Sequence, residues 1–341
     1  MPFFSRHCLA CIGLLLSVSL QAQPDYALIY QLKASVVKVH VSTAQGGHGV
    51  GTGVVVAPDT IATNCHILAH AASVNISKFG DSVSPVAMRA DWTHDVCLLQ
   101  FQYLQLPAVK LGVTEQLQYG QPVFSIGFPG GPPKPQTSAG TVRALYPLED
   151  SQILRADAAF TMGASGSPVF NAQGELIAMS TFKSPGRHAY YYSVPVTWIQ
   201  ALMRADTDTS APNAHAFWDQ PDTQQPFFMQ VVAPYQSADW PVLEGVARKW
   251  TAAQPDTAEA HFYLASALHG QGKLAEAEAE YTRCTRLQAR HLDAWQGLAL
   301  LARQTDKTEL LEQAKTAVLG LDRPTYDALI NTLKTTENGK E

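Results

Sequence analysis

Charged residues are spread unevenly along this chain, and this uneven spread predicts two domains of different architecture. Residues 23 to 200 carry 20 charged residues in 178 and hold 16 of the 23 glycines, whereas residues 239 to 341 carry 27 charged residues in 103. Short buried strands joined by glycine turns need few charges, whereas amphipathic surface helices need many. A chain of 341 residues is long enough to hold both.

The first part, residues 23–202, has the pattern of an all-β sandwich or barrel. Its apolar residues come in short runs, Val36 to Val41, Gly53 to Ala57 and Val96 to Phe101, and Gly, Pro, Asn and Asp interrupt the runs. This alternation of short apolar segments and turn residues is typical of antiparallel β-structure.

The last part, residues 239–330, shows helical spacing. Leu264, Ala265 and Leu268 fall on one helical face with Phe262, and Gly272 then breaks the helix. A second helix is indicated by apolar or small residues at Ala277, Tyr281 and Cys284.

The helical pattern returns after 34 residues. Leu298 follows Leu264 at this distance, and Ala299 follows Ala265. The region therefore resembles the tetratricopeptide repeat, and the alternative is an unrelated amphipathic bundle. The resemblance implies a concave surface for a peptide or protein partner, which includes Glu259, Phe262, Ser266 and Asp293.

Three further segments flank these domains. Residues 203–238 are rich in Asp, Thr, Pro, Gln and Ala, and we interpret them as a linker or degenerate repeat with one short helix near Phe227 to Val232. Residues 331–341 are expected to form a disordered tail. Residues 1–22 have the pattern of a signal peptide, with Arg6 and His7 before the apolar run Cys8 to Leu20.

The signal segment predicts an exported protein, periplasmic or secreted, that has no stable membrane anchor after cleavage behind Ala22. An uncleaved anchor is the alternative. Cleavage leaves Cys65, Cys97 and Cys284. Cys65 and Cys97 could pair if the fold brings them together, but two buried thiols are the simpler expectation.

Several functions are disfavoured by composition and motif spacing. A formal charge of -5 provides no basic field for nucleic acid. The glycines of Gly47 to Gly53 have the wrong spacing for a nucleotide loop, and His66 and His70 lack the Glu and the third ligand of a zinc helix. We therefore expect no cofactor and no metal.

A candidate for covalent catalysis is the serine at position 165, within the segment Gly163-Ala164-Ser165-Gly166-Ser167-Pro168. A serine hydroxyl becomes a good nucleophile only beside a base, and the base needs a carboxylate to orient it. His66 follows the strand pattern at 54–57, and Asp95 directly precedes the apolar segment that begins at Val96. Asp91 and His94 compete for the same two roles. The order His, Asp, Ser is the chymotrypsin order.

Further motifs extend along the whole β-rich part. They are Gly51-Thr52-Gly53-Val54, Thr63-Asn64-Cys65-His66, Asp95-Val96-Cys97-Leu98-Leu99, Ser125-Ile126-Gly127-Phe128-Pro129, Thr141-Val142, Asp157-Ala158-Ala159, Gly174-Glu175-Leu176-Ile177 and Ser193-Val194-Pro195. With the serine motif, they make this part similar to trypsin-like serine peptidases, above all those of the HtrA type. The resemblance implies a chymotrypsin-like double β-barrel and a serine endopeptidase that hydrolyses protein or peptide substrates.

The resemblance also implies roles for individual residues. Ser165 would be the nucleophile, His66 the base and Asp95 the orienting acid, with the N–H groups of Gly163 and Ser165 as the oxyanion hole. Other residues are expected on the substrate side of the site. They are Ala159 at the pocket floor, Phe160, Tyr190, and Thr181, which falls where the family places a residue that supports the Asp.

The sequence departs from the family at three positions and in one domain. Ala164 stands where Asn or Asp is usual, Ser167 where HtrA members have Gly, and Met162 where they often have Pro. Helical repeats take the place of the PDZ domain that follows the peptidase in most HtrA members. The alternative function is therefore a catalytically inactive peptidase-like scaffold that binds partners through its repeats.

Overall fold

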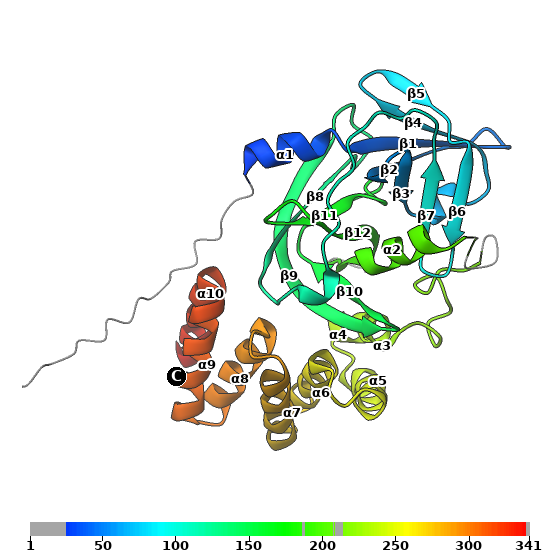
Figure 1. Ribbon diagram of the computed structural model, residues 1–341. Helices are drawn as coiled ribbons and strands as arrows, with labels where there is room; N and C mark the ends of the chain where they lie inside the picture. Colours follow the sequence, from blue (N-terminus) through cyan, green and yellow to red (C-terminus); the bar gives the residue numbers. More distant parts are fainter. Residues whose placement is uncertain (1–24, 186–187, 207, 209–213, 339–341) are drawn as a thin grey trace, which may run out of the picture.

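A β-rich part and a group of helices make up the molecule, and in Figure 1 the helices lie below the β-rich part. The computed structural model describes residues 25–185, 188–206, 208 and 214–338. The predicted signal segment, residues 1–22, lies outside the described residues. Among the described residues no helix combines the length and the apolar character that a membrane crossing requires.

The first β unit is a barrel-like sheet of seven strands in the order β5-β4-β1-β2-β3-β7-β6, preceded by helix α1 (Tyr26–Lys33). Its interior holds a separate apolar core that includes Val39, Ile61, Ile76 and Leu99. The strands are β1 (Val36–Thr43), β2 (His48–Ala57), β3 (Thr60–Thr63), β4 (Ala71–Lys78), β5 (Asp81–Val83), β6 (Ala87–Asp91) and β7 (Val96–Gln100).

The second β unit is a closed six-stranded barrel in the order β10-β13-β12-β11-β8-β9. Strand β12 is buried from Leu176 to Phe182, which explains why four apolar residues, Leu176 to Met179, follow one another without alternation. The strands are β8 (Pro122–Gly127), β9 (Gln136–Leu148), β10 (Ser151–Ala156), β11 (Pro168–Asn171), β12 (Leu176–Lys183) and β13 (Tyr191–Pro195). The expected fold class, a double β-barrel followed by a helical region, is confirmed.

The helices begin directly after the closed barrel. They are α2 (Val196–Arg204), α3 (Phe227–Gln230), α4 (Val232–Gln236), α5 (Trp240–Ala253), α6 (Ala258–Gly270), α7 (Leu274–Leu287), α8 (Leu292–Gln304), α9 (Thr308–Leu321) and α10 (Arg323–Asn338). Helices α6 and α8 begin 34 residues apart, as do α7 and α9, so this region fits a repeat region.

Helix α10 corrects one expectation. It continues to Asn338, so residues 331–338 are helical, whereas their sequence predicts a disordered tail. The physical reason is that Leu329 and Leu333, one helical turn apart, are both buried in the core. Residues 339–341 lie outside the described residues.

The helical region packs closely against the closed barrel, because one apolar core extends through both. Tyr146 of β9 stacks on Phe228 of α3 with ring centroids 4.5 Å apart, and its ring centroid is 6.3 Å from that of Trp250 on α5. Helix α6 is buried from Glu259 to Leu268. Burial therefore extends to its polar residues Glu259, His261 and Ser266 as well as to its apolar ones.

This docking corrects the expectation of an open concave surface. Glu259, Phe262 and Ser266 are all buried, and Glu259 Oε1 accepts a hydrogen bond from the hydroxyl of Tyr119 in the barrel at 2.9 Å. Asp293 accepts a hydrogen bond from Arg143 Nη2 at 3.0 Å. Glu259 and Asp293 therefore face the chain's own β-barrel, whereas Phe262 and Ser266 are buried among the helices.

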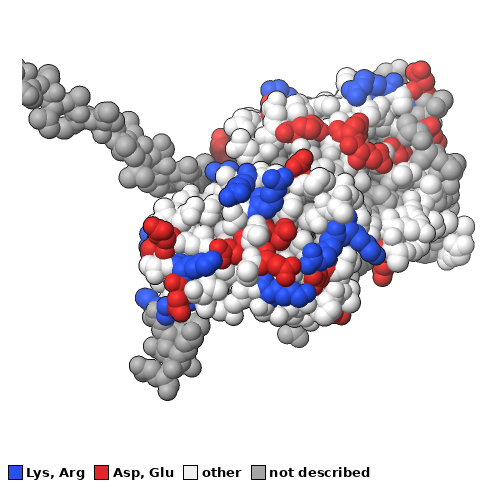
Figure 2. Space-filling view, turned by 90° about the horizontal axis from the view of Figure 1, so that it is seen from below, with Lys and Arg blue, Asp and Glu red and all other residues white. Residues whose placement is uncertain are grey.

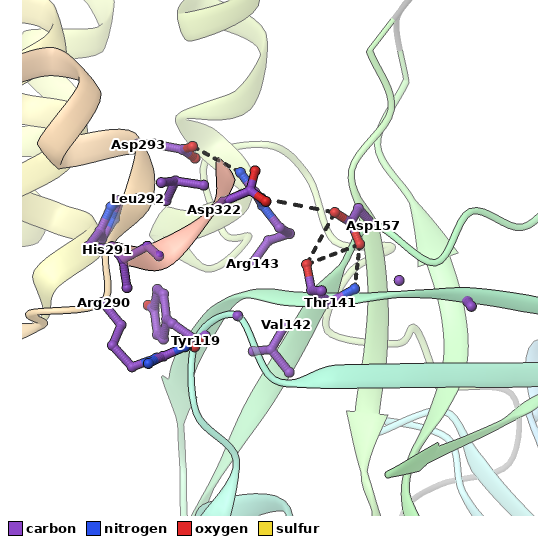
Figure 3. Close-up of a pocket in the computed structure, with 14 residues that line it drawn as sticks. Tyr119, Thr141, Val142, Arg143, Asp157, Arg290, His291, Leu292, Asp293 and Asp322 are labelled. Atoms are coloured by element: carbon purple, nitrogen blue, oxygen red, sulfur yellow. Dashed lines mark hydrogen bonds and ion pairs between the residues drawn. The ribbon is translucent and has the colours of Figure 1, made fainter. Parts of the chain in front are cut away.

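A cavity of about 430 Å³ remains in this interface, and Figure 3 shows side chains from both regions around it. Arg143 and Asp157 come from the barrel, whereas Arg290 and Asp322 come from the helical region. Arg290 Nε donates a hydrogen bond to the main-chain oxygen of Tyr119 at 2.6 Å. Polar pairs thus surround the cavity and connect the two regions.

The face seen from below carries charges of both signs side by side (Figure 2). Ion pairs on the helical region include Lys273 Nζ, which lies 2.7 Å from Glu244 Oε2, and Lys307 Nζ, which lies 2.6 Å from Glu278 Oε2. Such exposed pairs each contribute about 0 to 1 kcal/mol, so they matter more for solubility than for stability.

Candidate active site

His66 and Asp95 lie in contact beside the first sheet. His66 begins a single 3₁₀ turn after β3, and Asp95 precedes β7. His66 Nδ1 lies 2.6 Å from Asp95 Oδ2, and the main-chain N–H of His66 donates to Asp95 Oδ1 at 2.8 Å. Both carboxylate oxygens therefore hold the same residue, which fixes the ring and leaves Nε2 as the nitrogen that can take up a proton.

The backbone at Asp95 has an uncommon conformation, with a φ of 60°. Asp tolerates this left-handed region better than most residues, and such outliers concentrate at functional sites. The side chain of Asp95 is only 1% exposed, whereas that of His66 is 32% exposed. A buried acid beneath a half-exposed base is the arrangement that general-base chemistry requires.

Asn64 and Thr181 support the main chain of Asp95. Asn64 Nδ2 donates to the main-chain oxygen of Asp95 at 2.9 Å and to Thr181 Oγ1 at 3.1 Å. Thr181 Oγ1 in turn donates to the main-chain oxygen of Met179 at 2.9 Å. Thr181 is 2% exposed and contacts Asn64, which fits a residue that supports the Asp better than one on the substrate side. Its hydroxyl acts on Asp95 through Asn64, a residue to which the sequence analysis gives no role.

Ser165 lies in a turn between two glycines with positive φ, Gly163 at 89° and Gly166 at 84°. A Cβ on Gly163 would lie 2.5 Å from the main-chain oxygen of Phe128, and a Cβ on Gly166 would lie 2.0 Å from that of Thr52. Both positions therefore require glycine for space as well as for conformation.

Thr52 of β2 connects the serine turn to the first sheet. Its main-chain N–H donates to the oxygen of Ser165 at 2.8 Å, and its hydroxyl donates to the oxygen of Gly163 at 2.9 Å. Its main-chain oxygen accepts a hydrogen bond from the hydroxyl of Thr63, three residues before His66, at 2.7 Å. One buried threonine thus holds the serine turn against the strand that leads to His66.

The hydroxyl of Ser165 and the ring of His66 are not hydrogen-bonded to each other in the described structure. Such bonds are commonly long in ligand-free enzymes and shorten when substrate binds. Among the described residues, the N–H groups of Gly163 and Ser165 likewise donate to no protein acceptor. These two amides are free to bind an oxygen atom from outside the chain.

A pocket of about 300 Å³ adjoins the serine turn. Ala159, Phe160 and Tyr191 line it, and Ala164 lies at its boundary with the turn. The rings of Phe160 and Tyr191 lie 5.1 Å apart and narrow the pocket. No charged side chain is among the described residues that line it.

Tyr190, expected on the substrate side, is not among the described residues that line this pocket. Its ring lies over the Arg155 guanidinium at 4.4 Å, and the ring centroid of Tyr192 is 6.5 Å away. Side chains alternate along an extended chain, so Tyr191 points to the pocket where Tyr190 was expected.

Asp91 and His94, the competing acid and base, form a separate pair. His94 Nδ1 lies 2.6 Å from Asp91 Oδ2, and Nε2 lies 3.0 Å from Glu149 Oε2. Burial alone would lower the pKa of His94, but the bonds to Asp91 and Glu149 outweigh it and raise that pKa. Because both ring nitrogens are engaged with carboxylates, His94 is not available as a base for another group.

Cys65 and Cys97 form a disulfide, so the expectation of two buried thiols is wrong. The two residues lie on adjacent chains, because β3 and β7 pair antiparallel with Thr63 opposite Cys97. Cys65 directly precedes His66, and Cys97 follows Asp95 by two positions. The disulfide therefore joins the two segments that carry the candidate base and acid. Cys284 is a free, buried thiol.

Residues 51–179 match the family described as "Trypsin-like peptidase domain". The β-rich part contains a match to a trypsin-like peptidase domain. The matched residues of this peptidase domain include His66, Asp95 and Ser165, and they leave out the helical region.

Curated relatives resemble the peptidase domain at moderate identity. The mitochondrial serine protease HTRA2 of Bos taurus is 32% identical over 143 residues, which are 39% of this chain and 31% of the relative. A protein of Halomonas elongata named "Probable periplasmic serine endoprotease DegP-like" is 30% identical over 156 residues, 43% of this chain and 33% of the relative. The chain thus spans about a third of the length of these relatives.

Solved structures similar to the chain include two proteases. The active form of the Rv3671c protease from M. tuberculosis has a TM-score of 0.49 and 19% identity, and covers 63% of this chain and 98% of that one. The serine endoprotease from Yersinia pestis has a TM-score of 0.47 and 20% identity, and covers 53% of this chain and 66% of that one.

Proposed function

We propose that this chain is a serine endopeptidase that hydrolyses peptide bonds of protein or peptide substrates at Ser165. The observation that carries the proposal is the double hold of Asp95 on His66, beside a glycine-flanked serine turn with two unengaged amides. An orienting acid, a base, a nucleophile and an oxyanion site are the groups that acyl transfer needs.

Each group has one task in the proposed reaction. The hydroxyl of Ser165 attacks the substrate carbonyl carbon while its proton moves to His66 Nε2. The N–H groups of Gly163 and Ser165 stabilise the oxyanion, an effect of about 3 kcal/mol per donor in related sites. His66 then protonates the leaving amine, and a water molecule activated by His66 hydrolyses the acyl-enzyme. Asp95 orients the imidazole and stabilises its cation.

The pocket beside the serine turn suggests the specificity. Its aromatic pair, Phe160 and Tyr191, fills part of the available volume, and no described lining residue offers a charge. We infer that the residue preceding the cleaved bond has a small apolar side chain, because Lys, Arg, Asp or Glu would lose hydration without a partner.

Export from the cytoplasm is part of the proposal. The Cys65–Cys97 disulfide suits an oxidising compartment, and the H. elongata relative is named a periplasmic protein. The signal pattern in residues 1–22 agrees with both. The helical region is proposed to support the peptidase domain within the same chain, since the barrel covers its inner face, and to bind a protein partner at its outer face.

Cleavage of an unfolded polypeptide tests the function. We expect the wild-type protein to produce peptides from reduced, alkylated casein, with cuts after small apolar residues identified by mass spectrometry. Ser165→Ala should abolish cleavage, whereas Ser167→Ala, a buried serine two residues away, should retain it. A wild type that cleaves no casein, while a folded state is verified by circular dichroism, would favour the inactive scaffold.

A further inference from the structure

A tryptophan from outside the matched peptidase residues contacts the candidate acid and base. Trp218 Nε1–H donates a hydrogen bond to Asp95 Oδ2 at 3.1 Å. The same indole ring meets the edge of the His66 ring, with centroids 5.4 Å apart and planes at 88°. Residue 218 belongs to the segment expected to be a linker, beyond the residues 51–179 that match the peptidase family.

Hydrogen bonds hold the main chain around Trp218 on both sides. Before it, the N–H of Phe217 donates to the oxygen of Thr93 at 2.9 Å, in the turn that contains Asp95. After it, Gln225 Nε2 donates to the oxygen of Trp218 at 3.3 Å, and Gln230 Nε2 of α3 donates to the oxygen of Gln225 at 2.6 Å. A short series of bonds thus leads from α3 to the candidate acid.

The indole ring of Trp218 also packs against residues of the barrel and of the helical region. Phe182 at the end of β12 stacks on Trp218, with centroids 5.6 Å apart and planes at 17°. Trp218 also lines a groove of about 780 Å³ together with Met229, Val232 and Val246 of the helices that follow. The ring is therefore fixed between the barrel and the segment that leads to the helical region.

The hydrogen bond from Trp218 restricts the rotation of the Asp95 carboxylate. Oδ1 accepts from the main chain of His66, and Oδ2 accepts from both the His66 ring and Trp218. A carboxylate with three N–H donors cannot rotate without losing at least one charge-assisted bond. The Asp95 side chain is also only 1% exposed, and this shielding from water strengthens the Asp95–His66 interaction.

We propose that Trp218 is a positioning residue of the catalytic site, which fixes the Asp95 carboxylate so that His66 stays aligned for proton transfer. This inference rests on the proposed function. The segment 203–238, expected to be a linker, then has a role in the site, because its residue Trp218 positions the acid. Trp218 acts through Asp95 and His66 and does not need to touch substrate.

The test compares two tryptophans that undergo the same change. Trp218→Phe keeps an aromatic ring and removes the donor to Asp95. Trp198→Phe is the matched control, because Trp198 Nε1 also donates to a carboxylate, Asp150 Oδ1 at 3.2 Å, away from the acid and base. For each full-length variant we would measure the second-order rate of Ser165 labelling by a small fluorophosphonate, kcat and KM for a small ester, and the thermal midpoint.

For Trp218→Phe we expect labelling and kcat to fall about tenfold, with KM within about twofold of wild type. Trp198→Phe should change the thermal midpoint at least as much but leave labelling near the wild-type rate. Equal labelling of Trp218→Phe and wild type would overturn the role of Trp218, as would a loss that both variants share. A wild type that takes up no fluorophosphonate would overturn the proposed function itself, and the role of Trp218 with it.

Discussion

Asp95 is the residue on which the polar contacts of the candidate site converge. Three N–H groups point at its carboxylate, and Asn64 holds its main-chain oxygen. Both carboxylate oxygens accept N–H bonds, whereas a side-chain amide has only one acceptor oxygen. An amide at this position would therefore place its NH₂ group against at least one N–H donor.

Asp95→Asn should lower kcat/KM about 10,000-fold, because the amide NH₂ opposes N–H donors and favours the wrong tautomer of His66. The measurement is hydrolysis of a small ester across several enzyme concentrations. Asp91→Asn is the control, since it makes the same change in the neighbouring pair with His94, and it should stay within about threefold of wild type. A similar loss in both variants would contradict the assignment of Asp95.

Sequence patterns identify the candidate acid, base and nucleophile, but they do not identify the residues that hold these three in place. His66, Asp95 and Ser165 each lie inside a short local motif, so a pattern of neighbours can identify them. Thr52 and Trp218 act on residues 111 and 123 positions away, and nothing local marks such partners. Tyr190 and Tyr191 differ by one position along an extended chain, which reverses the side that each faces.

One contact between secondary-structure elements, the Cys65–Cys97 disulfide, lies directly beside the candidate acid and base. It joins the end of β3 to β7 over a sequence separation of 32. Cross-linking restricts the unfolded chain, and the native pairing of β3 with β7 already holds the two residues side by side.

Replacing Cys65 and Cys97 together with Ala should lower the free energy of unfolding by about 3 to 4 kcal/mol, as expected for a closed loop of this length. Urea unfolding followed by fluorescence measures the change. Cys284→Ala, which removes a buried thiol that forms no cross-link, serves as the control and should cost less. Addition of a reductant should destabilise the wild type and leave the double variant unchanged; equal sensitivity of the two would contradict the structural role.

Elements with a strong period could be predicted, whereas their ends and cross-links could not. The 34-residue offset anticipates the helix pairs α6–α7 and α8–α9, because each pair repeats one pattern of small and apolar residues. The disulfide was missed because an odd number of cysteines without paired spacing carries no signal of connectivity. The helix at 331–338 was missed because its buried leucines have meaning only beside the preceding helices.

At the scale of the whole molecule, the two β units and the helical region form one packed body. His94 connects the β units, since it bonds both Asp91 at the end of β6 and Glu149 in the turn between β9 and β10. The shared apolar core connects the closed barrel to the helices. Periodicity reveals that a helix has an apolar face but not what covers it, and this is why the expected partner surface includes residues that the fold buries.

The His94 connection should make stability depend on pH. Because the pKa of His94 is raised on folding, its stabilisation is complete below about pH 6.5, the unfolded value, and is lost as the pH rises through the raised pKa. We therefore expect His94→Gln to lower the urea midpoint more at about pH 6 than at about pH 9. Glu149→Gln should show a smaller effect with the same sign. A difference from wild type that is equal at both pH values would contradict this prediction.

Covalent labelling of the serine tests the central claim most directly. Intact mass spectrometry of the full chain after exposure to a fluorophosphonate reports whether a nucleophile is activated, and it requires no knowledge of the substrate. The account predicts one adduct on the wild type, mapped to Ser165 by peptide sequencing and absent from Ser165→Ala. No adduct on folded wild-type protein, or an adduct that persists in Ser165→Ala, would contradict it.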